Sequence, residues 1–281
     1  MKPEKTRPVI GVFDSGFGGL TVLKELVSMV SDADYLYFGD TARLPYGSKS
    51  AATVAHYAIS CARFIEQRGA SMLVVACNTA SALALNAVQQ AVTIPVIGVI
   101  EPGAASAAAA SKSKVVHVIA TAATVSSHAY RRALEDRGVV GIEKACPLFV
   151  PLVEEGWIDH PVTEQVAHIY MREVTAGDGR KQNNEDEPRA DVLVLGCTHY
   201  PLLRPVLRRI IPSHVRIIDS AEATAHLVAE KLGVSIGARR MNSAEAVLRF
   251  FATDSVDKFG TLGARFLGQR IDRVELVNFG D

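Results

Sequence analysis

The sequence carries no excess of either charge. Lys and Arg together number 30, Asp and Glu together number 30, and the formal net charge of the 281 residues is zero. A surface without a strong field of one sign has no means of attracting a polyanion or an anionic membrane. The charge balance therefore argues against direct nucleic-acid binding and against a membrane-surface protein.

Long apolar runs are also lacking. The run 9–13 stops at Asp14 and is too short for the apolar core of a secretory signal. The stretch 94–110 is interrupted by a Glu-Pro-Gly triplet, so it cannot span a bilayer. We therefore expect a cytoplasmic protein with no membrane contact.

The sequence has no Cys-x-x-Cys pair, and its eight histidines lack the i, i+4 spacing of a zinc site. No structural metal is expected. The four cysteines stand at positions 61, 77, 146 and 197 of a chain without an export signal. Such usage predicts reduced thiols and not a disulfide framework.

What the sequence does contain is a repeated alternation of short apolar runs with longer helical patterns. This alternation is typical of parallel sheets with crossover helices, and 48% apolar residues are enough for a sizeable core. Eight strands are expected in two sets of four: 9–13, 35–38, 72–76 and 96–99, then 115–119, 142–145, 192–195 and 215–218.

The two sets resemble each other where their third strands end, in LVVACNTA (73–80) and LVLGCTHY (193–200). We expect an α/β protein of two pseudo-symmetric parallel-sheet domains with the active site between them. Chance similarity of two α/β halves is the alternative. The first domain is predicted to comprise 1–100 plus 221–281, and the second 101–220.

Two further segments complete the expected organisation. The polar segment 177–190 is predicted to be a surface loop inserted in the second domain. After a helix over 221–231, the tail is expected to pack on the first domain, with a strand in 250–255 and a closing segment 274–279.

Cys77 and Cys197 follow corresponding strands of the two predicted domains. Ligands of open parallel sheets bind beyond the carboxyl ends of the strands. If the domains face each other, two thiols can approach one ligand from opposite sides, which is the geometry of racemisation. A thiol with an ordinary pKa of about 8.5 reaches both protonation states. Cys61 and Cys146 are interpreted as buried structural residues.

The segment DSGFGG (14–19) follows the first strand and opens a helix. Its glycines allow close backbone approach, and free N–H groups at a helix start could hold a carboxylate. The segment lacks the GxGxxG order and the P-loop lysine, so nucleotide binding is disfavoured. A tight turn with a helix cap is the alternative interpretation.

Seven sequence segments, spread over nearly the whole chain, together resemble those of the glutamate racemases. They occur in family order as GVFDSGFGGLTVLKEL, YFGDTARLPYGSKS, VVACNTASA, IPVIGVIEPG, VIATAATVSSHAY, CPLFVPLVEEG and VLGCTHYPLL. The resemblance implies interconversion of L- and D-glutamate without cofactor or metal, D-glutamate supply for peptidoglycan, and a homodimer.

The resemblance also implies the roles of individual residues. Cys77 and Cys197 would be the acid/base thiols, with Asp14 beside the first and with Glu154 and His199 near the second. Asp14 and His199 would also contact the substrate. The other substrate-binding residues would be Ser15, Tyr46, Gly47, Asn78, Thr79, Thr124 and Thr198.

Some features depart from the family pattern or allow another interpretation. Ala120 stands where the family usually has Gly, and Glu155 beside Glu154 leaves two candidate carboxylates, of which Glu154 is favoured by its distance to Gly156. His199 and Tyr46 could instead be structural residues. The rival functions are a racemase of aspartate or a hydantoin with the same thiols, and a redox-sensing thiol protein.

Overall fold

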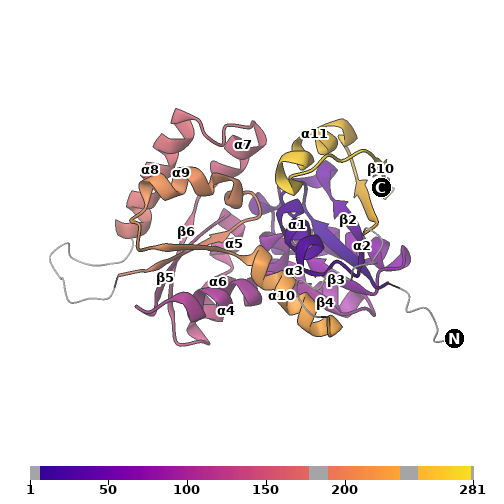
Figure 1. Ribbon diagram of the computed structural model, residues 1–281, viewed down its shortest axis with the longest axis horizontal. Coiled ribbons are helices and arrows are strands. Elements are labelled where there is room, and N and C mark those ends of the chain that lie inside the picture. Colours follow the sequence, from indigo (N-terminus) through magenta and orange to yellow (C-terminus); the bar gives the residue numbers. More distant parts are fainter. Residues whose placement is uncertain (1–6, 177–188, 235–245, 280–281) are drawn as a thin grey trace.

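Two parallel sheets form the framework (Figure 1). The protein is represented by a computed structural model that describes residues 7–176, 189–234 and 246–279. One sheet has the strand order β10-β9-β2-β1-β3-β4 and the other β6-β5-β7-β8. The strands are β1 (Val9–Asp14), β2 (Asp34–Gly39), β3 (Met72–Val75), β4 (Val96–Gly98), β5 (Val115–Ala120), β6 (Val140–Ala145), β7 (Val192–Gly196), β8 (Arg216–Asp219), β9 (Leu248–Ala252) and β10 (Val274–Leu276).

The two sheets repeat one topology. The order β2-β1-β3-β4 in the first corresponds to β6-β5-β7-β8 in the second, and the pairings of both are parallel. The predicted fold class is confirmed, and the eight predicted strands lie where the sequence placed them, with ends shifted by two residues at most. The tail is also as predicted, because β9 and β10 extend the first sheet beyond β2.

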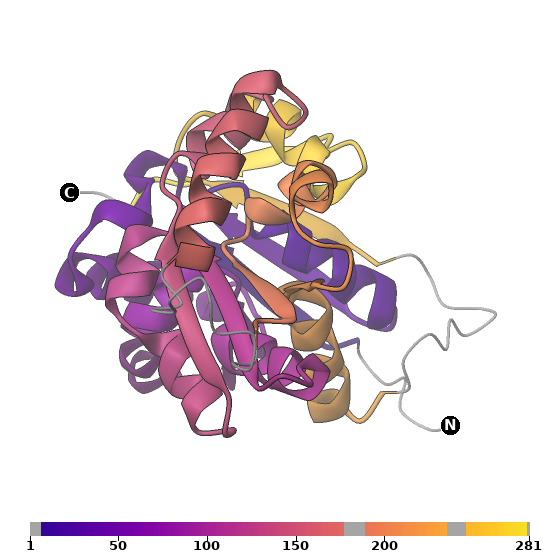
Figure 2. The ribbon, with the colours of Figure 1, turned by 90° about the vertical axis from the view of Figure 1, so that its left-hand side faces the viewer.

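Helices cover both faces of each sheet (Figures 1 and 2). α1, α10 and α11 share a core with one face of the first sheet and α2 and α3 with the other; α7–α9 and α4 with α6 cover the second sheet. They are α1 (Leu20–Met29), α2 (Ala51–Gln67), α3 (Asn78–Ala91), α4 (Ile100–Ala110), α5 (Ala122–Ser126), α6 (Ala129–Glu135), α7 (Phe149–Glu154), α8 (Pro161–Ala176), α9 (Arg204–Ile210), α10 (Ser220–Leu232) and α11 (Val256–Leu267), with 3-10 turns η1 (Thr41–Arg43), η2 (Tyr46–Ser48) and η3 (Tyr200–Leu203).

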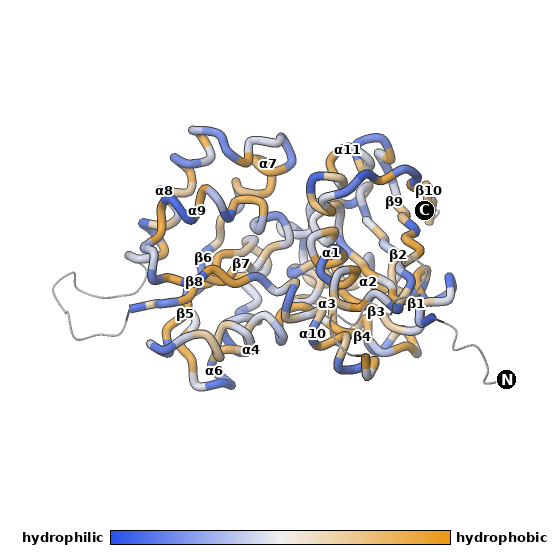
Figure 3. Tube along the Cα trace, viewed as in Figure 1, coloured by the Kyte–Doolittle hydropathy of each residue, from blue (hydrophilic) through white to orange (hydrophobic). Residues whose placement is uncertain are grey.

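The strands are apolar on both faces because helices lie on both sides. In β1, Ile10 and Val12 belong to one core cluster while Phe13 belongs to another, as the two-residue period of a strand requires. Gly11 allows α2 to approach closely, since a Cβ there would lie 2.2 Å from an Ile65 side-chain carbon. In Figure 3 the strands inside the protein are mostly apolar, and hydrophilic residues lie along parts of the outer helices.

The domain boundaries stay a prediction. α10, which follows β8, packs against both α1 and α4, so it touches helices of both halves. Residues 177–188 of the predicted surface loop lie outside the described residues. Across the part of the chain that the structure describes, no helix combines the length and apolar character needed to cross a membrane.

Candidate active site

One cavity of about 190 Å³ lies where the carboxyl ends of the two sheets meet. It receives residues that follow β1, β2 and β3 of the first sheet and β5, β6 and β7 of the second. The lining residues are Ser15, Gly16, Leu44, Pro45, Tyr46, Gly47, Ser48, Cys77, Asn78, Thr79, Thr121, Ala122, Pro147, Val150, Pro151, Glu154, Cys197, Thr198 and His199.

Cys77 lies at the N-terminus of α3, directly after β3. Its Sγ accepts a hydrogen bond from the Ala80 N–H at 3.4 Å, and its thiol donates to Ser15 Oγ at 3.5 Å. Burial and the nearby charge of Asp14 raise the pKa of Cys77 to about 12. In this state Cys77 is therefore a protonated thiol at neutral pH.

Cys197 occupies the corresponding position after β7 and has a cationic neighbour. Its Sγ lies 4.0 Å from His199 Nδ1, and His199 Nε2 lies 3.1 Å from Glu154 Oε1. Burial alone would lower the pKa of His199, but its contacts with Cys197 and Glu154 raise it to about 10. His199 is thus an imidazolium at neutral pH, 7% exposed and paired with a carboxylate.

Glu154, and not the adjacent Glu155, is the carboxylate that reaches the site. Its second oxygen lies 3.6 Å from Lys258 Nζ of α11. Burial acts to raise the pKa of Glu154, but the hydrogen bond and charge of His199 and the Lys258 ammonium together lower it. Glu155 has an exposed side chain and is absent from the cavity lining.

Asp14 is fully buried and lies behind the cavity lining. One of its oxygens accepts the Gly16 N–H at 2.9 Å, and the other accepts the Thr198 hydroxyl at 3.4 Å. Burial raises the pKa of Asp14, against the opposing charge of His199 and these hydrogen bonds. Asp14 thus connects the first strand of one sheet with the residue that follows Cys197.

The segment 14–19 contributes both to the cavity and to the contact between the two halves, and its use as a carboxylate site stays a prediction. Its lining members are Ser15 and Gly16. Gly18 instead packs across the domain contact, because a Cβ there would lie 2.2 Å from Thr198 Oγ1 and 2.6 Å from His199 Nδ1. The glycine serves close approach between the two halves.

Thr79, Thr121 and Asn78 form the polar wall beside Cys77, and the fully buried Thr124 lies behind that wall. Thr79 Oγ1 lies 3.0 Å from Thr121 Oγ1 and 3.2 Å from Thr124 Oγ1, so hydroxyls from both halves meet here. The Oδ1 atom of Asn78 accepts the Tyr130 hydroxyl at 2.7 Å, while its buried Nδ2 has no hydrogen-bond partner in the described structure. A buried donor without a partner is suited to a ligand acceptor.

Tyr46 and Gly47 also line the cavity. The Tyr46 ring borders the cavity, but its hydroxyl donates to Asp40, so this oxygen is directed away from a ligand. A Cβ at Gly47 would lie 2.8 Å from Thr121 Cβ. Gly47 therefore allows the loop after β2 to approach the start of α5.

The other two cysteines lie apart from this site, as predicted. Cys61 in α2 and Cys146 after β6 are fully buried and absent from the cavity lining. Thr121, Tyr130 and Lys258 were not among the predicted site residues. Thr121 could have been found as a cap signal before a helix, whereas the other two have no local signal. Within the described ranges, no group of three or more His, Cys, Asp or Glu is placed to hold a metal ion.

Fold and site together place one thiol from each of two similar α/β halves at a single cavity. The chain belongs to the Asp/Glu/hydantoin racemase family, whose family model matches residues 10–228. It is thus an amino-acid racemase.

Individual relatives cover nearly the whole chain. The glutamate racemase of Koribacter versatilis is 55% identical, with 98% of this chain and 99% of that protein covered. The one of Geobacter metallireducens is 47% identical, with 96% of each covered. Among solved structures, the Francisella tularensis glutamate racemase in complex with D-glutamate has a TM-score of 0.83 at 34% identity, covering 97% of this chain and 98% of that one.

Proposed function

We propose that the chain interconverts L- and D-glutamate by a two-base proton transfer between Cys77 and Cys197 that needs no cofactor. The observation that carries the proposal is that both thiols line one cavity and follow corresponding strands of the two sheets. Glutamate as the substrate is supported by relatives of that name across nearly the full length of the chain.

The step exchanges one proton for another at Cα. The thiolate of one cysteine takes the Cα proton, and the electron pair of the broken C–H bond stays on the substrate, delocalised into its α-carboxylate. The thiol of the other cysteine then delivers its own proton to the opposite face. The configuration is inverted, and the two sulfurs have exchanged protonation states.

The groups around the two thiols differ, which supports different roles for the two cysteines. Cys77 carries its proton at neutral pH and is the donor in the described state. His199 beside Cys197 is charged and held by Glu154, so it can balance a thiolate there or move a proton to it. Asp14 connects the two sides through Thr198.

The polar wall is suited to the α-carboxylate. Asn78 Nδ2 is a free donor, and the hydroxyls of Thr79, Thr121 and Thr124 are mutually bonded and can turn toward a ligand. Neutral donors bind a carboxylate without adding a base that competes with the thiols. Ser15 and the backbone near Gly47 border the remaining space for the side chain of the substrate.

Deuterium incorporation tests the proposal directly. Dialysed, reduced protein is incubated with L-glutamate in D₂O without added cofactor, and optical rotation and Cα deuterium are followed. Rotation should decay while deuterium enters the product enantiomer. The same assay on aspartate and a hydantoin tests the rival substrates, and a clear preference for either would overturn the glutamate assignment.

Cysteine variants separate catalysis from redox sensing. Cys77→Ala and Cys197→Ala should each lose racemisation by at least about a thousandfold, because one thiol cannot serve both faces. Cys61→Ala and Cys146→Ala are the matched controls, since both side chains lie outside the cavity. Full activity in either of the first two variants would exclude the two-base mechanism.

The biological role and the assembly follow as further parts of the proposal. D-glutamate would supply peptidoglycan synthesis in the cytoplasm, and expression of the chain should let a bacterial strain that requires D-glutamate grow without it. The homodimer stays a prediction, which light scattering of the purified protein checks.

A further inference from the structure

The orientation of the Asn78 carboxamide determines whether its oxygen or its nitrogen is available to a ligand. A carboxamide has an acceptor end and a donor end of nearly equal size, and only the donor end can bind a carboxylate. In the structure Oδ1 accepts the Tyr130 hydroxyl at 2.7 Å, and Nδ2 is the end without a partner. Asn78 is 3% exposed, so no bulk water competes for that donor.

The Tyr130 hydroxyl donates its proton in a hydrogen bond to Asn78. Tyr130 has one hydroxyl proton and gives it to Oδ1 of the carboxamide, so in its hydrogen bond with the Ser220 side chain the tyrosine oxygen is the acceptor. Gly103 provides the space for this pair, since a Cβ there would lie 3.0 Å from Ser220 Cβ and 3.3 Å from the Tyr130 hydroxyl oxygen. The chain Ser220–Tyr130–Asn78 thus selects one of the two carboxamide orientations.

The ring of Tyr130 contacts the other thiol segment. Its Cε2 would lie 3.0 Å from a Cβ at Gly196, the residue before Cys197, and the side chain is fully buried. The hydroxyl meanwhile bonds the residue that follows Cys77. One rigid aromatic side chain therefore spans the ends of the two corresponding strands.

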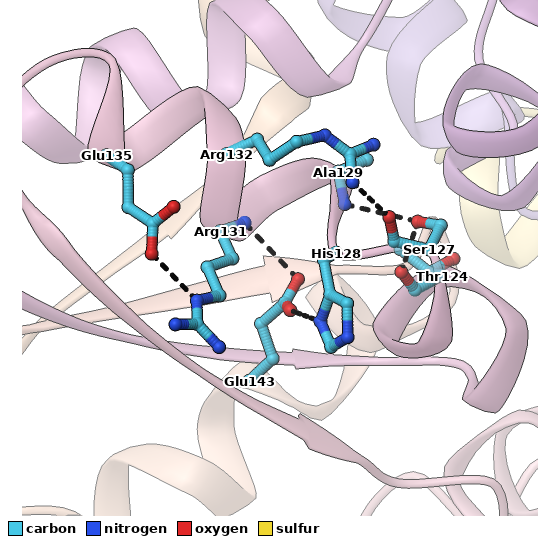
Figure 4. Close-up of polar contacts among 8 residues, drawn as sticks. All are labelled: Thr124, Ser127, His128, Ala129, Arg131, Arg132, Glu135 and Glu143. Carbon is cyan, nitrogen blue, oxygen red and sulfur yellow. Dashed lines mark hydrogen bonds and ion pairs between the residues drawn. The ribbon is translucent and has the colours of Figure 1, made fainter.

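The backbone around Tyr130 is fixed on both sides (Figure 4). The Ala129 N–H donates to Ser127 Oγ at 3.2 Å, and the Arg131 N–H donates to Glu143 Oε1 of β6 at 3.3 Å. These bonds satisfy N–H groups at the start of α6 that would otherwise be free. The hydroxyl position is consequently determined by the second sheet.

We propose that Tyr130 is a positioning residue of the racemisation reaction: its hydroxyl holds the Asn78 carboxamide with Nδ2 directed to the α-carboxylate of the substrate. The inference rests on the proposed function for the identity of the ligand. Without the hydroxyl, the carboxamide can rotate and present an oxygen to a carboxylate, which repels it.

Tyr130→Phe keeps the ring contact with Gly196 and removes only the hydroxyl. We expect kcat/KM for glutamate to fall about tenfold, which corresponds to ~1.4 kcal/mol. Asn78→Ala should cause a larger loss. The double variant should match Asn78→Ala within about twofold, because the hydroxyl acts through the carboxamide. Tyr35→Phe, which removes a buried hydroxyl that bonds the C-terminal end of α1, is the matched control and should leave kcat/KM unchanged.

Multiplicative losses in the double variant would overturn the inference and make Tyr130 a structural residue. A second measurement stands apart from turnover. The Asn78 side-chain amide protons, assigned by their absence from Asn78→Ala, should show nuclear Overhauser contacts to one set of neighbours in the wild type and Tyr35→Phe, and to two sets in Tyr130→Phe, where the carboxamide can turn about its Cβ–Cγ bond. If the wild type racemises no amino acid, the proposed function fails, and a single carboxamide orientation in Tyr130→Phe would separately overturn the positioning role.

Discussion

Alkylation of Cys77 should be slow at neutral pH and should become faster when Asp14 loses its charge. With a pKa of about 12, the thiolate fraction of Cys77 at pH 8 is about 10⁻⁴, against about 10⁻¹ for a thiol at the ordinary value of 9.0. Burial is the larger cause of this shift and the charge of Asp14 the second. Only the second cause is removed by Asp14→Asn.

The isosteric amide keeps an oxygen that can accept the Gly16 N–H, so the turn after β1 is preserved. A loss of about one pKa unit would raise the thiolate fraction of Cys77, and with it the alkylation rate at pH 8, by about tenfold. Racemisation, in contrast, should become slower in Asp14→Asn, because Asp14 connects the two sides of the site.

The assay is iodoacetamide labelling between pH 7 and pH 11, with each cysteine followed on its own peptide by mass spectrometry. The wild-type rate at Cys77 should rise about tenfold per pH unit through this range. Asp191→Asn, far from the cavity, serves as the control variant. A Cys77 titration centred below pH 9, or slower labelling in Asp14→Asn, would refute the reasoning.

Three other groups of the protein, two in the site and one remote from it, can be tested in the same way. A raised pKa keeps His199 charged below about pH 10; Glu154→Gln should lower that pKa, so the basic limb of the kcat/KM profile moves to lower pH, and an unmoved limb would count against the pairing. Gly18→Ala should destabilise the protein by ~1–3 kcal/mol in urea unfolding and reduce turnover at least tenfold, since its Cβ collides with Thr198 Oγ1. Burial acts to raise the pKa of Asp191, but hydrogen bonds from residues 111–113 outweigh it and lower that pKa to about 2. Its stabilisation is fully present above the unfolded pKa of about 4 and is lost as pH falls through about 2, so Asp191→Ala should cost about 1 kcal/mol at pH 7, after screening by solvent at this partly exposed carboxylate, and very little below pH 2.

The strands and the two thiol positions could be predicted because their signals are local. A β-branched run followed by a polar residue places that residue at the carboxyl end of a parallel strand, as found for Cys77 and Cys197. The similar endings of the two third strands also predicted the repeated topology. Both inferences need only neighbouring residues and the general behaviour of parallel sheets.

Contacts between distant segments gave no such signal. Tyr130 lies 52 residues from Asn78, and the sequence around it reads as an ordinary helix start. Lys258 reaches Glu154 from a tail helix whose position depends on β9 joining the first sheet. The choice of Glu154 over Glu155 likewise depends on the rotation of α7, which three-dimensional packing determines.

The pseudo-symmetry of the halves explains the positions of the two thiols but not their chemistry. Racemisation needs one thiolate and one thiol at the same time, so equal positions must have unequal surroundings. Cys77 is buried near a carboxylate and a neutral hydroxyl, whereas Cys197 lies beside an imidazolium held by Glu154. The fold places both sulfurs at one cavity, and in the proposed mechanism the residues next to each, which differ between the two repeats, give the two thiols unequal roles.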